Sequence, residues 1–284
     1  MNKLKLLFVL TVFSIITVSC EKNNGNNETT NVRDKFLVDK IYDYDDNLLA
    51  EYIYDDNNRL IKVIEKNFQN EMDKLEFEYE NGRVSKIIRY YDYSQESFFD
   101  HKPYEIHIFY NSQGQLIRRE FHISESTIGE NYLYENGRVV SIYSEDSKCD
   151  VDTFFYDKSM NVTKRIRVFS NLIFEDPTIG DPVIGETDMM ITYYFKYDDR
   201  PKPNFGLDYL FVYNPLPISA GGYLERSLSK NNMTEFVFES GEYTEKSTWT
   251  YTYNGNGLPS TIEIKHENET LNPEFLRITY KQIK

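Results

Sequence analysis

The chain has 284 residues, a formal net charge of −14 and 15% aromatic residues, among them 24 Tyr and 19 Phe. Its acidity excludes nucleic acid as an expected partner, because the phosphates would be repelled. Aromatic residues favour strands, so the composition predicts an all-β protein.

Residues 1–19 have the features of a secretory signal peptide. Lys3 and Lys5 form a basic start, an apolar run ends at Val18, and the small residue Ser19 precedes Cys20. The apolar run is shorter than the roughly 20 residues that a membrane-spanning helix needs. We therefore predict that this segment is removed on export.

Cys20 is the predicted lipidation site. The segment 17–20, Thr-Val-Ser-Cys, resembles the lipobox of bacterial lipoproteins, in which the Cys is acylated and becomes the new N-terminus. It departs from that pattern at Thr17, where Leu is usual, and an ordinary signal peptide with a chance Cys is the alternative. Two or three acyl chains, at about 0.8 kcal/mol per buried CH₂, would anchor the protein firmly. The sequence thus predicts attachment to the outer membrane, on either its surface or its periplasmic face.

Residues 20–33 follow as the lipidated Cys and an Asn-rich tether. Val32 is the only apolar residue of the stretch 21–33, EKNNGNNETTNVR. Such a segment cannot bury enough apolar surface to fold by itself. We expect a flexible linker that leads into a single domain of residues 34–284.

Hairpin repeats dominate that domain. In the stretch 75–80, Leu, Phe and Tyr alternate with three Glu, which is the period of a strand. Asn81-Gly82 follows, a pair that favours a two-residue type I′ turn, and a second short strand returns. Similar units occupy 52–60, 108–116, 132–142 and 251–259, and their marker tyrosines recur at intervals of roughly 25 residues, typical of a repeat array.

The repeats predict the architecture. One hairpin is marginally stable in water, whereas an array of hairpins buries a continuous aromatic face. We expect an antiparallel meander of hairpin repeats, curled into a barrel or a rolled shell that hides its edges. Within the turns, Glu80 would face Arg83 and Glu135 would face Arg138, as cross-strand pairs that help to fix the turn.

Two irregular insertions interrupt the repeats, near 171–190 and 200–222. The first contains a tandem Asp-Pro-x-Ile-Gly that starts at Asp176 and again at Asp181. The second is rich in Pro and apolar residues, and we expect it to pack against the sheet or to plug one end of a barrel. Long irregular segments often carry function; inert connections are the alternative. The candidate binding residues are Asp176, Asp181, Phe205, Tyr209 and Tyr213.

Motifs that carry chemistry are not found in the sequence. The four His do not have metal-ligand spacing. The acidic stretch that starts at Asp43 lacks the Gly and Glu positions of an EF-hand loop. Nucleophile-elbow, phosphate-binding and dinucleotide patterns do not occur either. We therefore predict no catalytic residue, no cofactor and no metal.

Two resemblances accompany these patterns. The units at 79–84 and 134–139, Tyr-Glu-Asn-Gly-Arg-Val, resemble the YD repeats that build a toxin-enclosing shell in Rhs-type proteins, although the chain has far too few copies for such a shell. The segments 197–204, 229–234 and 253–259 resemble a family of Bacteroidetes lipoproteins of unknown function with a porin-like β fold. That second resemblance covers most of residues 38–284. It implies the fold and the envelope location, and no catalytic residues.

Three functions follow as hypotheses. The first is a non-enzymatic, lipid-anchored envelope protein that binds or scaffolds a glycan or protein through its aromatic faces and loops. The second is an outer-membrane barrel, although many predicted strands are short against the roughly 9–11 residues needed to span. The third is a hydrolase with an unrecognised carboxylate site. The sequence leaves the oligomeric state open.

Overall fold

The computed structural model describes residues 35–66, 72–90, 103–123, 125–144, 151–169, 189–207, 223–268 and 271–283, without the side chains of Met72 and Tyr223. These residues contain 16 strands and one short helix. The first eight strands are β1 Phe36–Tyr42, β2 Leu48–Tyr54, β3 Leu60–Lys66, β4 Met72–Glu80, β5 Arg83–Tyr90, β6 Tyr104–Tyr110, β7 Leu116–Ile123 and β8 Ser126–Glu135. The remaining elements are β9 Arg138–Ser144, β10 Val151–Tyr156, β11 Val162–Phe169, β12 Met189–Pro201, α1 Tyr223–Leu228, β13 Asn231–Ser240, β14 Tyr243–Tyr253, β15 Pro259–His266 and β16 Glu274–Gln282.

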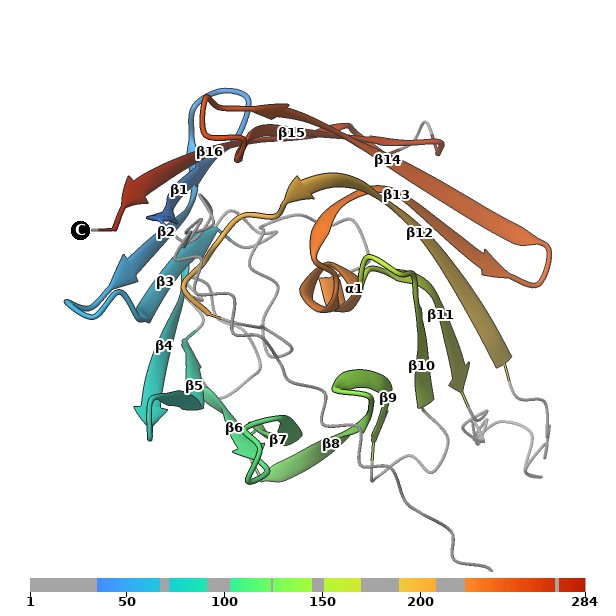
Figure 1. Ribbon diagram of the computed structural model, residues 1–284, viewed down its shortest axis with the longest axis horizontal. Helices are drawn as coiled ribbons and strands as arrows, with labels where there is room; N and C mark the ends of the chain where they lie inside the picture. The colour runs from blue at the N-terminus through green and yellow to red at the C-terminus, as the bar shows by residue number, and fades with distance from the viewer. Residues whose placement is uncertain are drawn as a thin grey trace, which may run out of the picture. The chain divides into compact units, whose positions relative to one another are not determined.

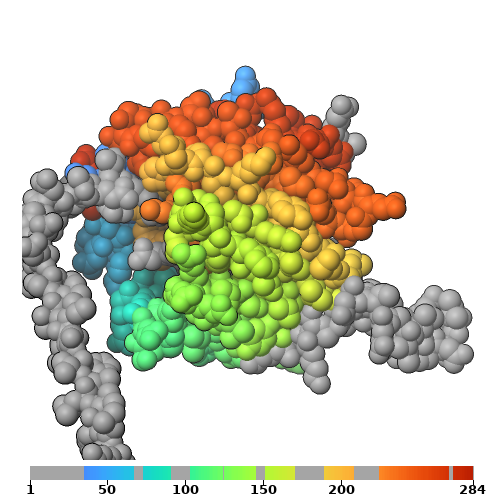
Figure 2. All heavy atoms as spheres, turned by 45° about the vertical axis from the view of Figure 1, so that its right-hand side comes forward, coloured from blue at the N-terminus to red at the C-terminus, as the bar shows by residue number. Residues whose placement is uncertain are grey.

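The strands form a closed antiparallel barrel. Each strand pairs with its neighbours in the sequence, and β1 pairs with β16 to complete the ring (Figure 1). Neighbouring colours lie side by side across the outer surface in Figure 2, as expected for a meander. The all-β prediction is confirmed, and the barrel is the correct choice between the two closures expected from the sequence. Closure pairs both edges of the meander, which removes the exposed strand edge that favours aggregation.

Two kinds of turn join the strands of the hairpins at the end of the barrel that holds the β2–β3 and β4–β5 connections, which we call the turn end. Asn81-Gly82 and Asn136-Gly137 both have positive φ at their two residues, so the predicted type I′ turns are confirmed. The longer turn that begins at Asp55 closes with the Asp55 N–H donating to the Arg59 carbonyl at 2.9 Å. The Asp55 carboxylate accepts the N–H groups of Asn57 and Arg59. Equivalent turns at this end begin at Asn111, Asp157 and Asn254, and one of the same form begins at Asp43 at the opposite end, because Asp and Asn side chains stabilise turns in this way.

The marker tyrosines explain the repeat. The Tyr79 hydroxyl on β4 donates to the Leu60 carbonyl at 2.8 Å, which ties one hairpin to the strand of the preceding hairpin. The same bond runs from other tyrosines to the neighbouring strand, at 2.7–2.9 Å: Tyr54 to Val38, Tyr110 to Val84, Tyr156 to Val139, Tyr251 to Met233 and Tyr280 to Pro259. A Tyr at this position therefore holds adjacent repeats together.

The turn arginines contact these tyrosines. Arg83 lies opposite Glu80 in the β4–β5 register, as predicted. However, no ion pair joins these two side chains within the described part of the chain. The Arg83 guanidinium instead lies 5.6 Å from the ring centroid of Tyr110 in the next hairpin, and Arg59 lies 4.9 Å from that of Tyr79. The predicted cross-strand charge pair is therefore wrong for Arg83, because a cation–π contact with the next repeat takes its place.

The barrel buries the apolar face of its strands inward. On β4, Leu75 and Phe77 are buried whereas Glu76 and Glu78 lie on the outer face. One continuous hydrophobic cluster runs around the interior. The helix α1 lies inside the ring of strands (Figure 1), where Leu224 joins this cluster. Burial of each large apolar side chain contributes about 1.5–3 kcal/mol, so the interior is the main source of stability.

Within the described part of the chain, no helix combines the length and the apolar character needed to cross a membrane.

Candidate functional site

A cavity of about 800 Å³ lies at the turn end of the barrel. We call it the rim pocket. It is formed by the β10–β11 turn, the end of β12 and the start of β13. Its lining residues are Asp157, Ser159, Asn161, Thr163, Phe195, Lys196, Tyr197, Asp198, Asp199, Pro201, Lys230 and Asn231.

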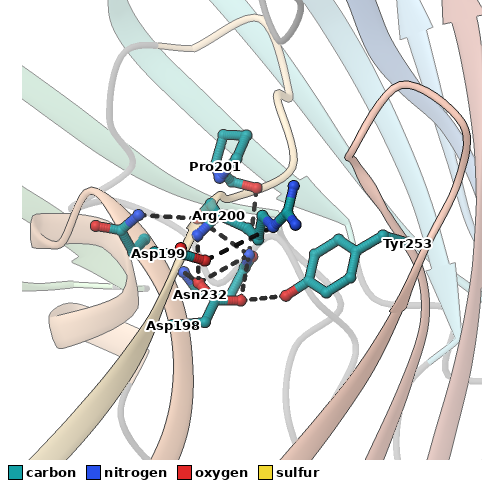
Figure 3. Close-up of polar contacts among 7 residues, drawn as sticks. Asp198, Asp199, Arg200, Pro201, Asn232 and Tyr253 are labelled. Carbon is teal, nitrogen blue, oxygen red and sulfur yellow. Dashed lines mark hydrogen bonds and ion pairs between the residues drawn. The ribbon is translucent and has the colours of Figure 1, made fainter.

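Asp198 holds one side of the rim pocket together (Figure 3). Its carboxylate accepts the N–H groups of Arg200 at 3.0 Å and Asn232 at 3.1 Å, and the side-chain amide of Asn232 at 3.1 Å. The Tyr253 hydroxyl at the end of β14 donates to the same carboxylate. Burial, together with the hydrogen bond and charge of Asp198, raises the pKa of Tyr253, so its phenol stays protonated as a donor. Asp198 thus joins three consecutive strands.

Asn161 performs the same task on the other side. Its side-chain oxygen accepts the N–H groups of Lys230 and Asn231, both at 3.0 Å, and its amide donates to the Asn231 side chain at 3.1 Å. The Val162 N–H donates to the Ser229 hydroxyl at 2.9 Å. These bonds fix the segment before β13 onto the β10–β11 turn, although the two are about 70 residues apart in sequence.

We call the hydrogen bonds around Asp198 and Asn161 the frame of the rim pocket. Other lining side chains take no part in it. The Asp199 side chain is 96% exposed and contacts only the Arg200 guanidinium, at 3.6 Å, among the described residues. Lys230 is exposed, and no ion pair of its ammonium group is found within the described ranges. Lys196 pairs with Glu235 at 2.7 Å and is still 71% exposed. The rim pocket therefore combines a rigid polar frame with accessible groups of both charges.

The binding residues predicted from sequence are mostly outside the described residues. Asp176, Asp181, Tyr209 and Tyr213 lie outside the described ranges, as does the predicted lipidation site Cys20. Phe205 is 5% exposed, and its ring centroid lies 5.0 Å from that of Tyr52 in the core. This places Phe205 in packing rather than at a surface, consistent with the expectation that the second insertion packs against the sheet.

Sequence reasoning missed a set of charged side chains on the inner face. Glu65 and Asp73 are cross-strand partners on β3 and β4. Arg89 lies 2.7 Å from the Asp73 carboxylate and 3.1 Å from that of Glu65. Burial raises the pKa of Glu65 to about 7, against the opposing charge of Arg89. The sequence did contain a signal for an inward-facing Asp73. Side chains two residues apart on a strand lie on the same face, and Asp73 therefore shares its face with Leu75 and Phe77.

A second buried cluster fastens α1 to the barrel. Glu225 of α1 is fully buried, and its carboxylate lies 2.9 Å from the Arg165 guanidinium on β11. Asp152 on β10 lies 3.6 Å from the same guanidinium. Burial raises the pKa of Glu225, and the charge of Arg165 opposes that shift. Both carboxylate pairs are thus enclosed and bound to arginine.

A third interior group contains the only histidine of the described residues whose side chain is buried. His266 lies 2.8 Å from the Ser247 hydroxyl through Nδ1, and 3.5 Å from the Glu274 carboxylate through Nε2. The Ser247 residue is only 2% exposed. A hydrolytic serine must reach its substrate, so this arrangement has the character of a satisfied interior network. Among the described side chains, no three from His, Cys, Asp and Glu are placed to hold a metal ion together.

Comparison with known proteins gives structural similarities alone. No family model matches the chain, and no curated protein matches it. A porin-like protein from Bacteroides vulgatus ATCC 8482 is similar at 12% identity and a TM-score of 0.42, over 87% of this chain and 100% of that chain. A porin-like protein from Bacteroides uniformis ATCC 8492 is similar at 14% identity and a TM-score of 0.47, over 87% and 96%.

The Photorhabdus luminescens Tc holotoxin pore is similar at 11% identity and a TM-score of 0.28, over 80% of this chain and 12% of that chain. All three TM-scores are below 0.5. The barrel fold therefore rests on the strand pairing of this chain, and no function is transferred from these structures.

Proposed function

We propose that this chain is a lipid-anchored, non-enzymatic protein of the outer membrane whose barrel is surrounded by water and serves as a binding or scaffolding module for a glycan or protein. The outer face of the barrel carries this proposal. A membrane-spanning barrel presents an apolar band about 25 Å tall to the lipid. Here the face opposite the hydrophobic cluster carries cross-strand charges.

The charges lie at mid-strand positions as well as at the ends. Glu76, in the middle of β4, lies 3.5 Å from the Lys62 ammonium on β3 and 3.2 Å from that of Lys74. Further outer pairs join Lys40 to Glu51, Lys86 to Glu78, and Lys196 and Lys246 to Glu235, at 2.7–3.1 Å. A Lys or Arg that faces lipid near the bilayer centre costs about 2–4 kcal/mol. Water is therefore the favoured surroundings of this face.

The sequence supports the anchored part of the proposal, because it predicts a lipid anchor at Cys20 and a tether at residues 21–33. A water-surrounded barrel needs such an anchor to stay at a membrane. The non-enzymatic part of the proposal is supported by the enclosure of both inner carboxylate pairs by arginine. The rim pocket, which is open at the turn end, is the part of the described barrel best suited to a partner.

The test separates anchoring from insertion. Full-length wild type and Cys20→Ala would be expressed in a Gram-negative host, and membranes would be washed with alkaline carbonate. We expect wild type to remain with the membrane and Cys20→Ala to appear in the soluble envelope fraction. A Cys20→Ala protein that stays in carbonate-washed membranes would favour the outer-membrane barrel instead. Protease treatment of intact cells then distinguishes the surface from the periplasmic face.

A further inference from the structure

We propose that the rim pocket binds a neutral, hydroxyl-rich ligand, namely a saccharide without charged substituents. This inference rests on the proposed function as a binding module and names its ligand class and its site. The volume of the rim pocket, about 800 Å³, is within the roughly 300–1,000 Å³ typical of small-ligand sites.

The mixed charge of the lining selects against ions. Three carboxylates line the rim pocket, from Asp157, Asp198 and Asp199. An anionic ligand such as a phosphate would be repelled by them. Two ammonium groups, those of Lys196 and Lys230, oppose a cation. A ligand without net charge avoids both penalties, because it is attracted through hydrogen bonds alone.

The hydrogen-bonding groups of the lining match hydroxyls. A sugar hydroxyl both donates and accepts, so it can bind a carboxylate and an ammonium at neighbouring positions. Asp199 supplies an acceptor, Lys230 supplies a donor, and Ser159 supplies a hydroxyl of both kinds. Among the described residues, these three side chains are not used by the frame around Asp198 and Asn161. They are therefore available to a ligand.

The frame makes the site rigid before a ligand arrives. Asp198 and Asn161 hold β12, the start of β13 and the β10–β11 turn in fixed positions through the hydrogen bonds described above. A site that is already ordered loses less conformational entropy on binding. The frame uses only the backbone N–H of Lys230, so the side chains proposed to bind the ligand can be changed without loss of the fold.

The experiment is a glycan array probed with the full-length chain extracted in mild detergent. The array carries neutral oligosaccharides beside sulfated and uronic-acid oligosaccharides of similar length. Neutral hits are measured by calorimetry with wild type and with the double variant Asp199→Ala/Lys230→Ala. A matched control, Asp56→Ala/Lys265→Ala, removes the same two residue types at exposed positions away from the rim pocket.

We expect neutral oligosaccharides to bind wild type and the control equally, and the double variant about tenfold or more weakly. Equal melting temperatures of all three proteins would show that the fold is retained. Binding restricted to charged oligosaccharides, no binding of neutral ones, or equal affinity of the double variant would each overturn the inference. The detergent extract is independent of how the chain is held, so failure here is distinguishable from failure of the Cys20→Ala test.

Discussion

Both faces of the barrel carry ion pairs, which are buried on the inner face and exposed to water on the outer face. Inside, Glu225 and Arg165 form an ion pair with both side chains at most 8% exposed. Outside, Lys86 and Glu78 form one at 3.1 Å with exposures of 23% and 53%. Water solvates the outer charges whether or not they are paired, so each outer pair contributes little. The inner charges depend on their partners, because an unpaired buried charge is very costly. The burial of an ion pair, more than the residue types in it, thus decides how strongly stability depends on it.

The largest expected effect comes from breaking an inner ion pair. Arg165→Met leaves Glu225 buried beside Asp152 without its cation, and we expect a loss of about 3–5 kcal/mol in the free energy of unfolding. The matched outer change, Lys86→Met, should cost at most about 1 kcal/mol. Denaturant unfolding of both variants measures the difference, and similar losses would contradict the inner–outer distinction.

Apolar residues should show the same contrast. Leu75, on the inner face of β4, is 2% exposed, whereas Leu133, on the outer face of β8, is 50% exposed. Leu75→Ala removes buried surface and leaves a cavity, for an expected loss of about 2–5 kcal/mol. Leu133→Ala should stay within about 0.5 kcal/mol. A large loss for Leu133→Ala in thermal unfolding would reveal that its face is covered in solution.

The pH dependence of stability should also differ between the faces. The pKa of Glu65 is about 7 in the folded chain against an ordinary value of 4.5. Between these values the folded state binds more protons than the unfolded state, so stability falls as pH rises through that window. Glu65→Gln should remove this loss, and the variant should gain about 3 kcal/mol relative to wild type between pH 4.5 and pH 7.5.

The outer carboxylate Glu76 provides the opposite sign. Although desolvation opposes it, hydrogen bonds and charges from Lys74, Tyr90 and Lys62 lower the pKa of Glu76. Its contribution is present above its unfolded pKa and is lost as the pH falls through the folded value. The two variants should therefore differ from wild type in separate pH windows: the gain of Glu65→Gln grows as the pH rises from 4.5 to 7.5, whereas the loss of Glu76→Gln disappears as the pH falls below 4.5. Parallel curves would contradict the assigned environments.

The smallest expected effect concerns a single hydroxyl. Tyr79→Phe removes the bond to the Leu60 carbonyl and should cost about 1–3 kcal/mol, because a partly buried acceptor loses its partner. Tyr194→Phe, on the outer face and 39% exposed, should have almost no effect. Hydrogen exchange at the β3–β4 pair would locate the loss. Unchanged stability of Tyr79→Phe would show that water replaces the tyrosine bond.

Local patterns of the sequence determined much of this protein. Alternation of Leu75, Phe77 and Tyr79 with glutamates predicts strands with one buried face, and Asn81-Gly82 predicts the turn, because both depend on neighbouring residues alone. Repetition of that unit predicts the meander. The rim pocket could not be predicted, because its contacts, such as Tyr253 with Asp198 and Lys230 with Asn161, join residues far apart in the sequence that no local pattern connects.

Tertiary structure decided what the sequence left open. Closure between β1 and β16 joins the two ends of the described chain, and no local pattern contains that pairing. The partners of Arg83 and Arg165 were decided in the same way, since a ring in the next hairpin and a carboxylate on α1 become neighbours only once the barrel is formed. Secondary structure depends on short-range periodicity, whereas charge pairing and the rim pocket depend on which strands the closed ring brings together.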